Sequence, residues 1–434
     1  MQALASLLIG VFFRQVEVEQ ASALTPGAPT VVVANHTNGL VDGLLLMAAL
    51  PRYPRLLGKS TLFRIPPLWP FLKLAGVIPV HRVQDGGTPQ QNVGAFATAE
   101  RLLGDGAMVA LFPEGISHDQ PAVQELRTGA ARIALAAAAA GVPGVVTVPV
   151  GLAYDDKARF RSRALVRVGS ADPVVGRVPA YRADGPAAVR ALTAQLAGDL
   201  AGVAPNYRSW VEADRLTELA EIVARPSGPA GPVSLALRGE VADRLGRALS
   251  AADPDRAAEL WAAFDRYRRA LEVLGVSDAR LAAGRPAGLA LGIGRAAVEA
   301  VAVSPLVVAG VALHAAPYAV VKRLARVPES PSMRATTKLL GCTAGFAGVY
   351  AALGVAVGRR RGVPSGLAAA ALGPVSGLVT LRVAERLAGV GGAVTTAARL
   401  RAGGGLLTAV RAERQAVVDR ATGLLDRWPV GASA

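Results

Sequence analysis

The sequence is poor in cysteine and in aromatic residues. Its one cysteine, Cys342, excludes an internal disulfide and indicates a reducing compartment. Because Cys342 lies in an apolar run, we interpret it as a small buried residue and not as a nucleophile. Phe, Trp and Tyr make up only 5% of the 434 residues, and they are not interleaved with the basic residues. We therefore expect no nucleic-acid partner.

The short motifs of several chemistries are also missing. No group of Cys and His residues has the spacing of metal ligands, so we expect no metal. No G-x-S-x-G elbow, Walker loop or dinucleotide-binding turn stands at a predicted strand end. Candidate catalytic residues must therefore be sought elsewhere, among the polar residues that follow the predicted strands.

Lysine is scarce, whereas arginine is abundant. The chain has 5 Lys, 42 Arg and a net charge of +15. A surplus of this sign favours anionic partners, such as lipid headgroups or phosphate-bearing substrates. Hydrophobic residues make up 52% of the sequence and the mean hydropathy is +0.37, so membrane contact is expected. A chain of this length can bury about two or three cores.

Short apolar runs alternate with helical stretches in the first 205 residues. The expected strands include 30–34, 76–82, 107–112, 145–152 and 164–169, with helical stretches near 91–103 and 121–140. This alternation is typical of an α/β fold. It predicts a mixed, largely parallel sheet that is flanked by helices.

Polar residues stand at the ends of three predicted strands. His36 follows the first strand, with Asp42 six positions later. A histidine with a nearby carboxylate is the smallest general-base pair, although Asn35 and Asp42 could instead serve only as cap and turn residues. Arg82 ends the second strand and Glu114 follows the third. Because strand ends of a parallel sheet can converge on one edge, these groups are expected to form one site.

Four ordered blocks carry a family resemblance. They are Asn35–Asp42 (NHTNGLVD), Gly76–Arg82 (GVIPVHR), Phe112–Ser117 (FPEGIS) and Val148–Leu152 (VPVGL). In order and rough spacing they resemble the motifs of the glycerolipid acyltransferase family. Two further stretches resemble the branch that acylates glycerol-3-phosphate or dihydroxyacetone phosphate, namely Arg127–Arg132 (RTGAAR) and Phe160–Arg163 (FRSR).

The resemblance implies a role for each matched residue. It implies that His36 deprotonates the acceptor hydroxyl, which attacks an acyl thioester, and that Asp42 orients His36. The residues that it assigns to substrate binding are Glu114, Gly115, Arg82, Lys59 and Ser117, and it places Pro149 on the acyl side. Two alternatives stay open, because Arg82 could be a solvated charge and Ser117 a turn or cap residue. No cofactor is expected beyond the donor, acyl-CoA or acyl-carrier protein, because a thioester is already activated.

The spacing of the first block departs from the family pattern. Five residues separate His36 from Asp42, whereas four are usual in the family. One extra residue rotates a side chain by about 100° on a regular helix. We therefore expect the two side chains to meet only across a turn or bulge.

The second half of the chain contains no matching catalytic block. We predict an acyltransferase domain over 1–205, a helical bundle or hairpin over 206–285, apolar membrane-associated helices over 286–400 and a basic amphipathic tail over 401–434. Three runs without Asp, Glu, Lys or Arg are long enough to cross a bilayer: 300–321, 339–358 and 362–381.

The charges that flank the second apolar run argue against three simple spans. Basic residues lie on both sides of this run, so the positive-inside rule cannot satisfy both ends of one span. We therefore expect a helical hairpin in which at least one segment is half-inserted or packed on the catalytic domain.

With the apolar second half, the family resemblance implies an enzyme of phospholipid biosynthesis at the cytoplasmic face of the cell membrane. It would transfer a fatty acyl group from acyl-CoA or acyl-carrier protein to glycerol-3-phosphate or dihydroxyacetone phosphate. One alternative is a 1-acylglycerol-3-phosphate (lysophosphatidate) acyltransferase. A more distant alternative is a non-catalytic lipid-binding scaffold. The expected partners are the thioester donor, the phosphate-bearing acceptor and membrane lipid.

Overall fold

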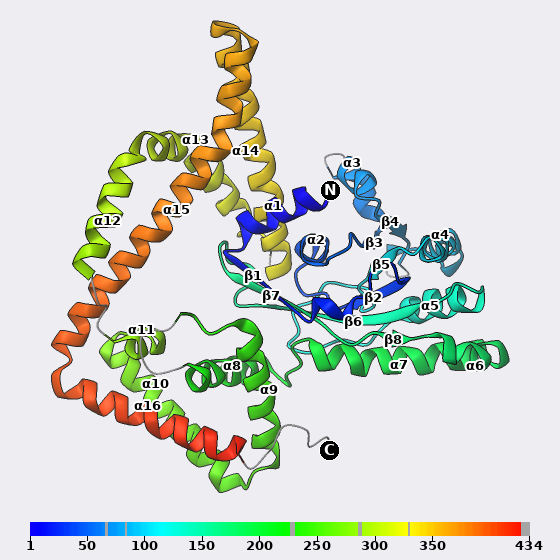
Figure 1. The fold of residues 1–434 in the computed structure, drawn as a ribbon, viewed down its shortest axis with the longest axis horizontal. Helices are drawn as coiled ribbons and strands as arrows, with labels where there is room; N and C mark the ends of the chain where they lie inside the picture. The colour runs from blue at the N-terminus through cyan, green and yellow to red at the C-terminus, as the bar shows by residue number, and fades with distance from the viewer. Residues whose placement is uncertain (66–67, 83–84, 226–230, 285–288, 329, 427–434) are drawn as a thin grey trace. The chain divides into compact units, whose positions relative to one another are not determined.

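The computed structural model describes the chain except for residues 66–67, 83–84, 226–230, 285–288, 329 and 427–434 (Figure 1). The chain divides into two compact units. The first comprises Met1–Ala213 with Ala325–Leu339, and the second comprises Asp214–Leu324 with Leu340–Ala434. The first unit contains all four blocks that were recognised in the sequence.

A mixed sheet forms the centre of the first unit. Its strands are β1 (Gln15–Glu19), β2 (Thr30–Ala34), β3 (Arg55–Lys59), β4 (Ile78–Val80), β5 (Met108–Leu111), β6 (Val146–Tyr154), β7 (Arg163–Val168) and β8 (Asp172–Pro173). They follow the order β1-β7-β6-β2-β5-β3-β4, and β8 pairs with β6. Only the pairs of β6 with β7 and with β8 are antiparallel among the described strands. This confirms the predicted α/β class with a mixed, largely parallel sheet.

Helices cover both faces of this sheet (Figure 1). They are α1 (Gln2–Phe12), α2 (Leu40–Ala49), α3 (Trp69–Leu74), α4 (Val93–Gly104), α5 (Gly129–Ala139), α6 (Val178–Ala183) and α7 (Gly185–Val203). Strand β2 shows the two-sided burial most clearly. Val32 and Ala34 belong to the core with α1 and α2, whereas Val31 and Val33 belong to the core with α4, α5 and α7. Successive strand residues point to opposite faces, so an unbroken apolar run suits a strand buried on both sides.

The end of α1 is held by Arg161, one of the residues used to recognise the family branch. Its guanidinium donates to the carbonyls of Gly10 and Phe13 at 2.9 and 3.1 Å. The last carbonyls of a helix lack partners within the helix, and a cation there also complements the helix dipole. Arg163 pairs with Asp155 at 2.6 Å. Both arginines therefore stabilise the first unit.

The second unit is helical. Helix α8 (Trp210–Ala224) crosses the division between the units, and α9 (Leu235–Ala251), α10 (Pro254–Leu274), α11 (Asp278–Ala283) and α16 (Gly404–Leu425) follow. Helix α16 packs against α9 and α10, with Val410 and Val417 fully buried. At the centre Asp278 accepts from Arg225 and Arg414 at 2.9 and 2.8 Å.

The apolar helices are α12 (Leu289–Ala302), α13 (Ser304–Leu324), α14 (Pro331–Arg361) and α15 (Val363–Ala402). Three segments are long and apolar enough to cross a membrane: Ser304–Leu324, Met333–Arg361 and Val363–Ala402. At most 17% of each apolar window is buried in the protein, which suits helices that face lipid.

Helices α14 and α15 form the expected hairpin. Only Gly362 separates them, and a Cβ at Gly366 would lie 2.5 Å from the Gly354 carbonyl oxygen. Close approach at small residues is typical of helix packing in membranes. The first turns of α14 belong to the first unit, where Ala335 and Leu339 are buried in the core that contains α1 and α2. One apolar helix therefore does begin on the unit that carries the recognised blocks.

Candidate active site

The site is built around the pair formed by His36 and Asp42. His36 follows β2, and Asp42 lies in the first turn of α2. The Nδ1 atom of His36 lies 2.9 Å from Oδ2 of Asp42. The Asp42 side chain is fully buried, whereas the His36 side chain is 18% exposed. Because a carboxylate only accepts, Nδ1 carries the proton, and Nε2 keeps the lone pair that a general base needs.

A glycine turn accommodates the longer spacing between these two residues. Gly39 has φ 57° and ψ −129°, a conformation in which a Cβ would be strained. Helix α2 starts directly after it, and the Asn38 N–H donates to Oδ2 of Asp42 at 2.7 Å. The pair thus meets across a turn, as the sequence predicted.

Tyr154, at the end of β6, completes the environment of Asp42 and was not identified from the sequence. Its hydroxyl donates to Oδ1 of Asp42. Burial, and then the charge of Asp42, raise the pKa of Tyr154 well above its ordinary value, so the hydroxyl stays a donor at neutral pH. The Phe13 ring stacks on Tyr154 with centroids 5.6 Å apart. The sequence feature that could have identified Tyr154 is its position two residues after the fourth block.

We expect Tyr154→Phe to lower the kcat for transfer about tenfold with little change in the acceptor KM. The carboxylate of Asp42 would lose one of its donors, and a hydrogen bond to a charged group contributes about 1.5–3 kcal/mol. Steady-state kinetics would test this. Tyr53→Phe is the matched control, because it removes a hydroxyl that donates to the Ala75 carbonyl in the same unit. Equal losses in both variants would contradict a specific role for Tyr154.

The loop after β5 holds the His36 backbone. Oε2 of Glu114 accepts the His36 N–H at 2.6 Å, and the His118 N–H donates to the His36 carbonyl at 3.1 Å. Nε2 of His118 also lies 2.9 Å from Oε1 of Glu114. The Ser117 hydroxyl accepts the Gly39 N–H at 3.0 Å. These contacts position His36, while the predicted binding of substrate by Glu114 and Ser117 stays a prediction.

Asn35 connects the His36 turn to β6. Its side chain donates to the Leu152 carbonyl at 3.0 Å and accepts the Leu152 N–H at 2.7 Å. Asn35 is buried, so this pair of bonds replaces strand pairing where β2 ends. Asn35 thereby aligns the strand end that carries His36 with the strand end that carries Tyr154.

Three cationic side chains gather near Gly115. Arg82 donates through Nη1 to the Gly115 carbonyl. The Arg127 side chain packs over the same glycine, since a Cβ there would lie 3.4 Å from Cγ of Arg127. Among the described residues, the Arg127 guanidinium has no hydrogen-bond or ion-pair partner. Asp85 links Lys59 to Arg82, because its Oδ1 lies 3.0 Å from Nζ of Lys59 and its Oδ2 lies 2.9 Å from Nε of Arg82.

Pro149 lies inside the sheet. It pairs in register with Val33 of β2, and its ring packs against Gly169. Its predicted place on the acyl side stays a prediction.

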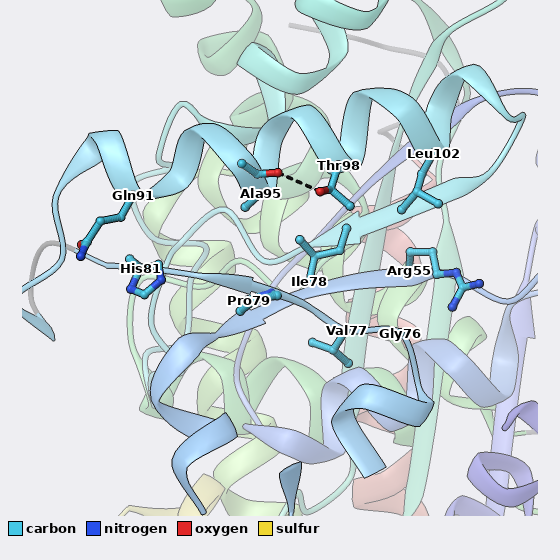
Figure 2. A pocket seen from close by; sticks show the side chains of 11 residues that line it. Arg55, Gly76, Val77, Ile78, Pro79, His81, Gln91, Ala95, Thr98 and Leu102 are labelled. Carbon is cyan, nitrogen blue, oxygen red and sulfur yellow. Dashed lines mark hydrogen bonds between the residues drawn. The ribbon is translucent and has the colours of Figure 1, made fainter. Parts of the chain in front are cut away.

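A groove of about 450 Å³ lies along β4 and α4 (Figure 2). Val77, Ile78 and Leu102 line it, and Figure 2 places Arg55 and His81 toward its opposite ends. No residue that the sequence predicted for the site lines this groove. We therefore define the site by the contacts around His36. Within the described residues, no group of three or more His, Cys, Asp or Glu could hold a metal ion.

Parts of the chain are similar to known proteins. A family model described as Acyltransferase matches residues 15–153. Glycerol-3-phosphate O-acyltransferase 2 of Saccharomyces cerevisiae is 37% identical over 96 residues, which are 22% of this chain and 13% of that protein. An uncharacterized acyltransferase of Schizosaccharomyces pombe is 44% identical over 76 residues, which are 17% of this chain and 11% of that protein. The chain thus matches only a small part of either relative.

One solved structure is also similar. The 1-acyl-sn-glycerophosphate (LPA) acyltransferase PlsC from Thermotoga maritima has a TM-score of 0.34 and 18% identity, over 45% of this chain and 76% of that chain. A similarity of that size carries no argument about function. The match to the Acyltransferase family model, over residues 15–153, includes His36, Asp42, Arg82 and Glu114.

Proposed function

We propose that the protein is a membrane-associated O-acyltransferase that acylates glycerol-3-phosphate or dihydroxyacetone phosphate. The observation that carries this proposal is the oriented pair of His36 and Asp42. The loop that holds the His36 backbone through Glu114 continues into Gly115, where the cations lie. A base and an anion site together suit an acceptor that has both a hydroxyl and a phosphate. The name of the yeast relative, glycerol-3-phosphate O-acyltransferase 2, supports the same acceptor.

In the proposed reaction, Nε2 of His36 removes the proton of the acceptor hydroxyl as the oxygen attacks the thioester carbonyl. The resulting imidazolium is stabilised by Asp42, 2.9 Å from Nδ1. The tetrahedral intermediate then collapses, the C–S bond breaks, and His36 returns the proton to the departing thiolate. An ester forms and a free thiol is released. Arg82, Lys59 and Arg127 would hold the acceptor phosphate during these steps.

The apolar helices support membrane association. Three segments of the described chain could each cross a bilayer. The proposed chemistry also joins a water-soluble acceptor to a fatty acyl chain, so its product belongs in the membrane. We further propose that the catalytic unit faces the cytoplasm, because acyl-CoA and acyl-carrier protein are cytoplasmic donors.

An assay with separate acceptors tests the function. The full chain, purified in detergent, would receive labelled acyl-CoA or acyl-carrier protein with glycerol-3-phosphate, dihydroxyacetone phosphate or lysophosphatidate. We expect thiol release and labelled product with the first or second acceptor. His36→Ala measures the background thioester hydrolysis. A preference for lysophosphatidate would instead indicate a lysophosphatidate acyltransferase. Absence of turnover with every acceptor would contradict the proposal that the protein is an acyltransferase.

A further inference from the structure

One carboxylate bridges two of the three cations near Gly115. Oδ1 of Asp85 lies 3.0 Å from Nζ of Lys59, and Oδ2 lies 2.9 Å from Nε of Arg82. The hydrogen bonds from Lys59 and then Arg82 hold the pKa of Asp85 below its ordinary value. The carboxylate is therefore ionised at neutral pH. Its two oxygens stand where two oxygens of a bound phosphate would contact the same cations.

The charges near this carboxylate favour exchange with a stronger anion. Lys59, Arg82 and Arg127 are cations, and Asp85 supplies one negative charge to them. The oxygens of Glu114 face other partners, because they accept the N–H groups of His36 and Gln124 and Oε1 lies 2.9 Å from Nε2 of His118. A phosphate monoester carries about 1.5–2 negative charges at neutral pH. It can therefore replace Asp85 at Lys59 and Arg82 and also engage Arg127.

The backbone around Asp85 has support that does not need the carboxylate. The Asp85 and Gly87 N–H groups both donate to the Arg82 carbonyl, at 2.9 and 3.0 Å. Asn92 exchanges two hydrogen bonds with the His81 backbone, at 2.7 and 2.6 Å. The Asp85 side chain is partly exposed, and its described partners are Lys59 and Arg82. Its charge can thus be tested without removing these backbone bonds.

We propose that Asp85 is an internal competitor that occupies the phosphate subsite until the acceptor displaces it. This inference rests on the proposed function, because it assigns the occupant of that subsite. Asp85 makes every anion compete with a carboxylate that is already in place. Anions of low charge cannot displace this carboxylate from Lys59 and Arg82. A phosphate monoester can displace it, because the phosphate carries more charge and also contacts Arg127. The price is a weaker affinity for the acceptor itself.

Inorganic phosphate is the direct probe of this competition. Calorimetry on the detergent-purified full chain, at low salt and mildly alkaline pH, would compare wild type with Asp85→Asn. Partly exposed ion pairs contribute little, so we expect the Kd for phosphate to fall about 3–10-fold in the variant. In kinetics, the KM for the acceptor should fall by a similar factor while kcat is retained.

Two further variants make the result specific. Asp105→Asn changes the net charge equally at the exposed end of α4 and should leave phosphate binding unchanged. Lys59→Gln should weaken phosphate binding, the opposite sign to Asp85→Asn. If Asp85→Asn unfolds at a lower temperature than wild type, Asp85→Ser repeats the measurement with a smaller side chain.

The possible outcomes separate this inference from the proposed function. Equal or weaker phosphate binding in Asp85→Asn would show that the carboxylate orders the cations and does not compete. Absence of phosphate binding in both wild type and variant would also overturn the inference. The calorimetry does not depend on catalytic turnover. Tighter phosphate binding in Asp85→Asn, with no acyl transfer by wild type, would therefore reject the acyltransferase function and support the competition by Asp85.

Discussion

Replacing His36 with alanine is expected to lower kcat for acyl transfer by about 10²–10⁴-fold, the usual contribution of a positioned general base. The Nε2 atom of this imidazole keeps the lone pair, because Nδ1 donates to Asp42. The backbone bonds of His36 to Glu114 and His118 do not involve the side chain. The variant should therefore fold normally and fail only in chemistry.

Thiol release with saturating donor and acceptor would measure the loss, and thermal unfolding would check the fold. His314→Gln is the control, because it alters another partly buried histidine, in α13 of the second unit. We expect that variant to keep the wild-type kcat. A loss smaller than about tenfold in His36→Ala would place the general base on another residue.

The second large effect is expected at Asp42, where two substitutions separate charge from geometry. Oδ2 accepts from both His36 and the Asn38 N–H, while Oδ1 faces the Tyr154 hydroxyl. In Asp42→Asn the amide oxygen can keep the first position and the amide nitrogen can donate to Tyr154. The imidazole then keeps its orientation but loses the carboxylate that stabilises its charged form. An ion pair at this separation contributes about 4 kcal/mol near a protein surface, so kcat should fall about 10²–10³-fold.

Asp42→Ala should lower the stability of the protein as well as its kcat. It leaves the buried Asn38 N–H and the Tyr154 hydroxyl without their acceptor. Each such loss costs about 1–3 kcal/mol, so the free energy of unfolding should fall by about 2–6 kcal/mol. Denaturant unfolding would measure this difference, and kinetics would measure kcat for both variants. Wild-type kcat in Asp42→Asn would show that the carboxylate charge has no part in catalysis.

Much of the site was visible in the sequence because it lies in short contiguous blocks. His36 and Arg82 each end or follow a predicted strand, and parallel strands bring such ends to one edge. Glu114 was also found in a block, but the sequence did not reveal its contacts within the protein. Its carboxylate holds the His36 backbone and His118. A residue's presence in a block does not reveal which atoms it contacts.

The contacts that the sequence did not predict join residues that lie far apart in the chain. Tyr154 reaches Asp42 over 112 positions, and Asn35 reaches Leu152 over 117. Neither contact has a local pattern, because it depends on β6 pairing beside β2 in the sheet. Arg161 illustrates the reverse case. It belongs to a stretch that resembles a family branch, yet its guanidinium caps α1.

The α/β class, the apolar helices and the choice of His36 as the candidate base could all be read from the sequence, because periodicity and short blocks are local properties. Folding was needed to bring the distant parts of the candidate site together. It closed the six-residue interval to Asp42 through the Gly39 turn, placed Tyr154 behind that carboxylate and set Asp85 between Lys59 and Arg82. Hydrogen bonds and ion pairs depend on distances between atoms, and for residues far apart in the chain only folding sets those distances.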